Sequence, residues 1–123
     1  MDIALWIVSC LLAAVFLGSG IAKSSMSRER LIATGQTGIA PFPMPVVRMT
    51  AIAELAGAVG LIAPWLSGTA MVLTPMAAIG LGIVMCGAQI SHASLREPKS
   101  VAINLTLLIP CAFVAAGRLA QLF

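Results

Sequence analysis

Residues 3–22 read IALWIVSCLLAAVFLGSGIA, a run of 20 residues without a charged side chain. A helix rises by about 1.5 Å per residue, so a helix of this length spans a hydrocarbon core about 30 Å thick. Secretory signals begin with a basic region, whereas only Met1 and the acidic Asp2 precede this run, so we expect the segment to remain in the protein. The run therefore predicts a membrane-spanning helix.

The rest of the chain has the same character. Of its 123 residues, 60% are apolar and 9% are charged, against about 45–50% and about 25% in an ordinary soluble domain. We expect Pro64 and Gly68 to mark a tight break that ends one helix. The predicted fold class is all-α, an integral membrane four-helix bundle in a single transmembrane domain over residues 1–123. The predicted spans are residues 3–22, 46–65, 70–91 and 101–120.

The sequence argues against several classes of function. The net charge is +3, but the basic residues flank the apolar runs instead of forming a stripe on a soluble face, which argues against nucleic-acid binding. Cys10, Cys86 and Cys111 fall at different depths, and no Gly-rich phosphate loop, H-E-x-x-H or Cys-x-x-Cys occurs. We therefore expect no metal site and no bound cofactor. Haem is not expected, because His92 and Met85 share one helix and do not make an axial pair.

The basic residues predict an orientation. Arg118 lies on one side of the predicted bundle, and the other six basic residues lie on the opposite side, beside the first and third breaks. Because cytoplasmic loops carry an excess of Lys and Arg, both termini are predicted to lie outside the cytoplasm. Trp6 and Trp65 fall near the outer surface, where aromatic belts form. The six residues are Lys23, Arg28, Arg30, Arg48, Arg96 and Lys99.

Each predicted helix carries nearly all of its polar side chains on one face. Positions separated by four, seven and eleven residues share a face of a helix, and this spacing gives one stripe per helix. We expect these four stripes to face one another inside the bundle. They consist of Ser9, Ala13, Phe16, Gly20 and Lys23; Thr50, Glu54, Gly57, Ala58 and Leu61; Ala78, Gly82, Met85, Gln89 and His92; and Asn104, Leu108, Cys111, Ala115 and Arg118.

Glu54 is the sharpest signal among these residues. It lies eight residues beyond Val46, which places it about 12 Å inside the hydrocarbon region. An ionised carboxylate there costs at least about 2.5–3.5 kcal/mol, so Glu54 should face the bundle and either find a partner or stay protonated. The candidate partners on the other helices are Lys23, Gln89, His92 and Asn104.

Two interpretations of these polar residues stay open. In the first, they line a pocket for a lipophilic molecule, with Glu54 and His92 as proton-handling, catalytic residues. In the second, they hold the helices together, with Lys23 and Arg118 reaching to the headgroups and Asn104 capping the fourth helix. The ligand-binding residues of the first interpretation are Lys23, Thr50, Gln89, Asn104 and Arg118.

The chain resembles the DoxX-like membrane proteins over nearly its whole length. The resemblance rests on five features in order: FLGSGIAK at residues 16–23, ELAGAVGL at 54–61 closed by a proline, ISH at 90–92, Asn104, and AGR at 116–118. It implies a bacterial four-helix bundle of the inner (plasma) membrane, with the family's recurrent polar positions at Lys23, Glu54, His92, Asn104 and Arg118. The family's name comes from a subunit of a thiosulfate:quinone oxidoreductase. The absence of a cysteine pair in this chain argues against a direct thiol-redox role.

Three functional hypotheses follow. The first is a membrane-embedded binding subunit for a quinone-like molecule or a redox partner, with Glu54 as the central polar contact. The second is an enzyme, an isomerase or cyclase that performs acid/base chemistry on a lipophilic substrate, and the third is a structural or chaperone-like partner of another membrane protein. An enzyme needs Glu54 beside an open cavity, whereas a scaffold would bury it in a closed network. The lipid-facing surface of four short helices also leaves room for a homo-oligomer.

Overall fold

The computed structural model describes residues 2–34 and 36–123, and every regular element in these residues is helical. Four helices are long and apolar enough to cross a membrane. This confirms the predicted all-α membrane bundle with four spans. The long helices are α1 (Asp2–Ser25), α3 (Met44–Ser67), α4 (Leu73–Ser94) and α5 (Pro98–Leu122), and the short helices α2 (Arg28–Ala33) and η1 (Thr37–Ile39) lie between α1 and α3.

The prediction that a break begins at Pro64 was wrong. Helix α3 continues through Pro64 to Ser67 and ends at Gly68, whose φ of 71° is the left-handed conformation that often follows a helix. Pro64 has no N–H to donate to the Gly60 carbonyl one turn earlier. The Thr74 hydroxyl of α4 donates to that carbonyl instead, at 2.9 Å. A neighbouring helix therefore satisfies the group that the proline leaves free, as is common within membranes.

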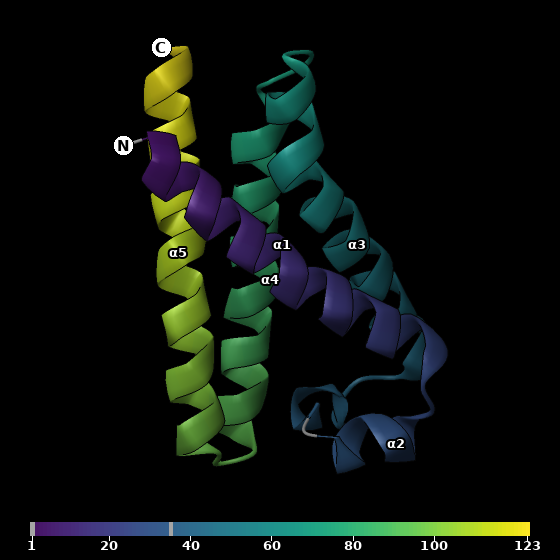
Figure 1. Cartoon of the computed structure of the whole chain (residues 1–123). Helices are drawn as coiled ribbons and strands as arrows, with labels where there is room; N and C mark the ends of the chain where they lie inside the picture. The colour runs from purple at the N-terminus through teal and green to yellow at the C-terminus, as the bar shows by residue number, and fades with distance from the viewer. Residues whose placement is uncertain (1, 35) are drawn as a thin grey trace.

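The four long helices form two packed pairs. Helix α1 packs mainly against α3, and α4 packs mainly against α5. Figure 1 shows α4 and α5 side by side, with α1 crossing them obliquely and α3 leaning in the same direction as α1. Both chain termini and the α3–α4 connection lie at one end of the bundle, here named the terminal end. Helix α2, η1 and the α4–α5 turn lie at the other, named the loop end (Figure 1).

The packing differs between the two ends. The main core joins all four long helices through apolar side chains that include Leu12, Phe16, Leu61 and Leu81. Toward the loop end, α1 and α3 diverge from α4 and α5 (Figure 1). A separate small cluster at that end packs α2 and η1 onto α3 through Leu31, Ile39 and Val47.

Most residues of the four predicted stripes face inward. The buried residues of α1 include Ser9, Phe16, Gly20 and Lys23, and those of α5 include Asn104, Cys111, Ala115 and Arg118. Glu54, Gly57, Ala58 and Leu61 of α3 and Ala78, Met85 and His92 of α4 are also buried. Thr50, Gly82, Gln89 and Leu108 are half-buried.

Candidate functional site

A cavity of about 760 Å³ lies at the loop end, where the two helix pairs diverge. Most of its wall is apolar, including Phe16 of α1, Val47 of α3 and Met85 of α4. Four of the residues predicted from the sequence line it, one from each long helix, and these are Lys23, Thr50, His92 and Asn104. Thr34 and Gln36, which the sequence did not single out, line the cavity on the side of α2 and η1.

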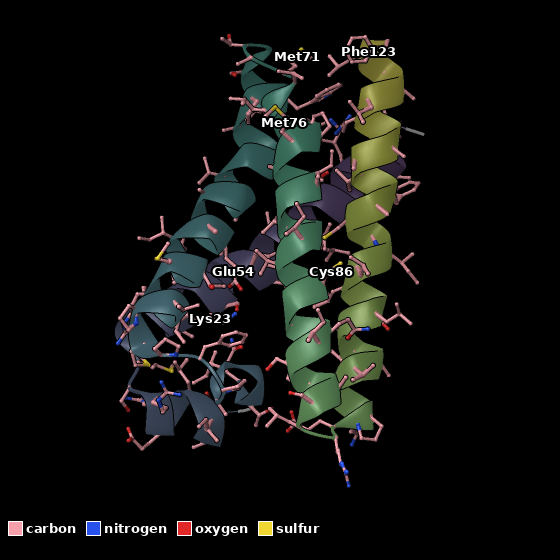
Figure 2. All side chains as sticks on the ribbon, turned by 180° about the vertical axis from the view of Figure 1, so that it is seen from behind. Lys23, Glu54, Met71, Met76, Cys86 and Phe123 are labelled. Atoms are coloured by element: carbon pink, nitrogen blue, oxygen red, sulfur yellow. The ribbon has the colours of Figure 1, made fainter. Side chains whose placement is uncertain are left out.

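Glu54 pairs with Lys23, one of the partners predicted for it. The Lys23 Nζ lies 2.5 Å from Glu54 Oε1, and Figure 2 shows the two labelled side chains next to each other between α1 and α3. Glu54 is 0% exposed and does not line the cavity, whereas Lys23 does. Glu54 Oε2 has no hydrogen-bond partner among the described residues. Glu54 therefore lies behind Lys23 and holds the ammonium at the cavity wall.

The local sequence of α1 and α3 explains how this pair forms. A Cβ added at Gly20 would lie 2.7 Å from Leu55 Cγ and 3.1 Å from the Ala51 carbonyl oxygen, so the glycine is needed for α1 to approach α3. Lys23 follows less than one turn later and Glu54 lies between Ala51 and Leu55, which brings the two charges together. The Arg48 guanidinium donates to the Lys23 carbonyl oxygen and ties the end of α1 to α3.

Asn104 reaches the cavity from the opposite helix pair. Helix α5 begins at Pro98, so Asn104 lies in its second turn and the prediction that it caps this helix was wrong. Its side chain is 9% exposed, and its Nδ2 has no hydrogen-bond partner among the described residues. Gln89 is half-buried and is not among the lining residues, and Thr50 donates its hydroxyl to the Val46 carbonyl oxygen within α3. Asn104 is therefore a buried donor at the cavity wall.

His92 connects the cavity wall, through Glu97, to helix η1 at the loop end. Its Nδ1 lies 2.8 Å from Glu97 Oε1, and the Thr37 hydroxyl of η1 donates to the same oxygen at 2.9 Å. The hydrogen bond from His92, followed by that from Thr37, lowers the pKa of the Glu97 carboxyl below its ordinary value. Gln36 adds a second tie, because its Nε2 donates to Ser19 Oγ of α1 at 3.1 Å. Helix η1 is thus fastened to both helix pairs.

Thr37 and Glu97 belong to this site but were not among the residues predicted from the sequence. Glu97 lies in the connection between α4 and α5, five residues after His92. A carboxylate at that spacing beyond a terminal histidine is a local signal that could have indicated the pair. Thr37 gave no such signal, because it lies 60 residues from Glu97 in the chain.

Arg118 does not belong to this cavity. It lies at the terminal end, with its guanidinium 5.1 Å from the centre of the Trp6 ring and 4.3 Å from that of Trp65. Its Nη1 donates to Asp2 Oδ1 at 2.7 Å and to Gln121 Oε1 at 2.8 Å. Arg118 is 0% exposed, so the alternative that it extends to the headgroups was wrong. The structure divides the predicted polar residues between a cavity at one end and a closed cluster at the other.

The cavity has the chemistry of a site for an amphipathic molecule. Apolar walls accept a hydrocarbon portion, while the Lys23 ammonium and the Asn104 amide offer hydrogen-bond donors to a polar head. Among the described residues, no group of three His, Cys, Asp or Glu side chains is placed to hold a metal ion.

Comparison with known proteins gives the family. The model of the DoxX-like family matches residues 7–114, so the chain belongs to the DoxX-like family. No curated protein and no solved structure shows a significant match to it. Together with its four apolar helices, the family identifies this chain as a small integral membrane protein.

Proposed function

We propose that this protein is a membrane-embedded binding subunit that holds a lipophilic, quinone-like molecule in the cavity at its loop end. One observation carries the proposal. Two buried donors, Lys23 from the α1/α3 pair and Asn104 from the α4/α5 pair, line a single cavity whose other walls are mainly apolar. Ligand sites of this kind combine apolar walls with a few placed polar groups.

The donors favour a neutral head group that accepts hydrogen bonds. An ammonium has three N–H donors, and the structure shows one bond from Lys23 Nζ, to Glu54 Oε1. The charges of Lys23 and Glu54 compensate each other, so an anionic head would meet little net positive charge from this pair. A ring carbonyl, as in a quinone, accepts from Lys23 or Asn104 without bringing an uncompensated charge into the membrane.

Glu54 acts in this proposal by positioning Lys23. Its carboxylate is 0% exposed and does not line the cavity, which supports a binding role better than direct acid/base chemistry by Glu54. His92 does line the cavity and also contacts Glu97 outside it. An imidazole carries a proton on either nitrogen, so His92, oriented by Glu97, is placed to pass a proton to a bound molecule. A quinone that gains two electrons from a redox partner takes up two protons, which would come one at a time through His92 from water at the loop end.

The orientation is part of the proposal. We place the protein in a bacterial inner membrane with both termini outside the cytoplasm, so that the loop end faces the cytoplasm. Arg28 and Arg30 of α2, Arg96 of the α4–α5 turn and Lys99 in the first turn of α5 support this, because all four lie at the loop end. Arg118 lies at the terminal end, where Asp2 compensates its charge.

Binding of a defined quinone tests the proposal. The probe is dimethoxy-methyl-benzoquinone carrying a decyl chain, and saturable binding is measured with the full chain in lipid nanodiscs. Asn104→Leu should weaken binding about tenfold, because it removes one hydrogen bond of about 1–1.5 kcal/mol. Thr106→Val is the matched control, since Thr106 is exposed on the same helix and, among the described residues, bonds only to the Ala102 carbonyl oxygen.

A second probe distinguishes the contribution of the head group to binding from that of the tail. Decylbenzene has the same chain and no carbonyl, and it should compete poorly with the quinone. The proposal fails if the natural chain shows no saturable quinone binding, or if Asn104→Leu and Thr106→Val bind the quinone equally well.

A further inference from the structure

We infer that the bound molecule enters this cavity from the bilayer and that its apolar tail leaves between α1 and α5, beside Gly18. The inference rests on the proposed function and deepens it, because it assigns the tail a path and a residue that selects for it. The path of the tail is inferred from the shape of the cavity wall along α1. The residues of that wall make no polar contact with a head group.

The cavity opens along one face of α1. Ala14, Val15 and Gly18 of α1 line the cavity and are exposed, as are Thr34, Phe42 and Val46 around the connection from α2 to α3. Residues that belong both to a cavity wall and to the outer surface form the rim of an opening. Because α1 is one of the four helices that can span the membrane, the α1 part of this rim faces hydrocarbon and not water.

The crossing of α1 and α5 explains why the opening lies there. The two helices contact closely at the terminal end, where a Cβ added at Gly117 would lie 2.5 Å from Leu5 Cδ2. From that point α1 runs away from α5 toward the loop end (Figure 1). Gly18 and the α5 residues Asn104 and Leu107 line the same cavity, on the side where α1 and α5 have diverged.

Gly18 differs from the packing glycine in the same helix. A Cβ added at Gly20 would meet Leu55 at 2.7 Å, whereas a Cβ added at Gly18 would meet nothing within 4 Å. Close helix packing therefore gives no reason for a glycine at position 18, although glycine is unfavourable inside a helix. A larger side chain would instead extend from the rim into the opening. Asn104, with an unpartnered Nδ2 on the same cavity, independently indicates a ligand.

The α4 side offers a competing exit. Gly87 also lines the cavity, is exposed and has open space around an added Cβ. On that side, however, Gly87 is the only residue of α4 that is both exposed and part of the wall, whereas α1 contributes three. Thr34, Phe42 and Val46 lie at the loop end, before or in the first turn of α3, whereas the three α1 residues lie well inside a helix that can span the membrane. We therefore assign the tail to the α1 rim, and the experiment compares the two glycines directly.

The test measures whether the effect of a rim substitution on binding affinity depends on the length of the probe's tail. Two probes share one ring, the tailless dimethoxy-methyl-benzoquinone and the same quinone with a decyl chain. Gly18→Leu should weaken binding of the decyl probe about tenfold, because the leucine side chain occupies the space of the tail, and should leave the tailless probe within about twofold. Gly80→Leu is the matched control, because Gly80 is exposed, has equally open space and does not line this cavity.

The outcomes distinguish this inference from the proposed function. Absence of binding of both probes to the natural chain overturns the proposed function itself. If the natural chain binds the decyl probe and Gly18→Leu does not weaken it, the tail path is wrong while the binding site stands. If Gly87→Leu alone weakens the decyl probe, the exit lies on the α4 side and the inference is also overturned. Leucine is a better helix former than glycine, so folding of these variants is not at risk from the helix itself.

Discussion

The two ends of this bundle each bury a cation, and the two cations have different surroundings. At the terminal end, Arg118 lies between the rings of Trp6 and Trp65 and bonds to Asp2, whose side chain is 57% exposed. At the loop end, Lys23 bonds to Glu54, which is 0% exposed, and its other side faces a cavity.

This difference separates a structural cation from one that is available to a ligand. Aromatic faces attract the Arg118 guanidinium and fill the space around it, so that α1 and α5 are held in close contact. Arg118 Nε and Nη2 and Asn104 Nδ2 all lack a hydrogen-bond partner among the described residues, but Lys23 and Asn104 line the cavity and Arg118 does not. A buried charge is therefore informative about function only together with the space that surrounds it.

The largest expected effect comes from removing the cation at each end. Lys23→Met leaves the Glu54 carboxylate without a partner in the core, and we expect a loss of about 3–5 kcal/mol in the free energy of unfolding. Arg118→Met leaves only the exposed Asp2 unpaired and removes the two ring contacts, so about 1–2 kcal/mol is expected. Unfolding in mixed detergent micelles, followed by tryptophan fluorescence for Lys23→Met and by circular dichroism for both, measures the two losses.

A double variant controls for the cause of the larger loss. Adding Glu54→Gln to Lys23→Met removes the isolated charge and should restore more than half of the lost stability. If the double variant is as unstable as Lys23→Met, the loss does not come from an unpaired carboxylate. A larger loss for Arg118→Met than for Lys23→Met would reverse the comparison between the two ends.

A smaller effect is expected from adding side-chain volume at each end. Gly117→Leu at the terminal end forces a side chain into the space of Leu5, which is itself buried, and overpacking of this kind costs about 1–3 kcal/mol. Gly18→Leu at the loop end enters open space and should be neutral or slightly stabilising. The same unfolding measurement compares them, and equal destabilisation by both variants would contradict the contrast between a closed and an open end.

The smallest expected effect is a shift in the pKa of Glu97, which hydrogen-bonds to His92 and Thr37 at the loop end. The pKa of the Glu97 carboxyl should lie below its ordinary value of 4.5, because His92 and Thr37 hydrogen-bond to the carboxylate. His92→Ala should raise this pKa toward 4.5 more than Thr37→Val does, as seen by NMR titration of the Glu97 side-chain carbon. Titration of Glu97 at 4.5 in the natural chain would show that the hydrogen bonds from His92 and Thr37 are absent in the membrane.

The sign of the pH effect follows from the direction of this shift. A carboxyl whose pKa is lowered by folding stabilises the folded state at pH values above its unfolded pKa. That contribution is lost as the pH falls through the lowered pKa of the folded state. The attachment of η1 to the α4–α5 turn should therefore weaken only in acid, below a pH of 4.5.

Much of the fold could be predicted because a membrane leaves few choices. The four spans were recognised from apolar length alone, and the inward faces from the spacing of polar residues. The partner of Glu54 was narrowed to four candidates, since a carboxylate at that depth requires a partner. The error at Pro64 arose because the Thr74 hydroxyl, which satisfies the freed carbonyl, comes from another helix.

The sequence by itself determined that this chain crosses a membrane four times and that its polar side chains face inward, because hydrocarbon excludes unpaired polar groups wherever the chain passes. Only the tertiary structure decided which of those polar residues share a space. Hydropathy gives each helix a length and a face but no crossing angle. The oblique path of α1, close to α5 at Gly117 and diverging from it toward the loop end, encloses Arg118 at one end and leaves Lys23 and Asn104 beside a cavity at the other.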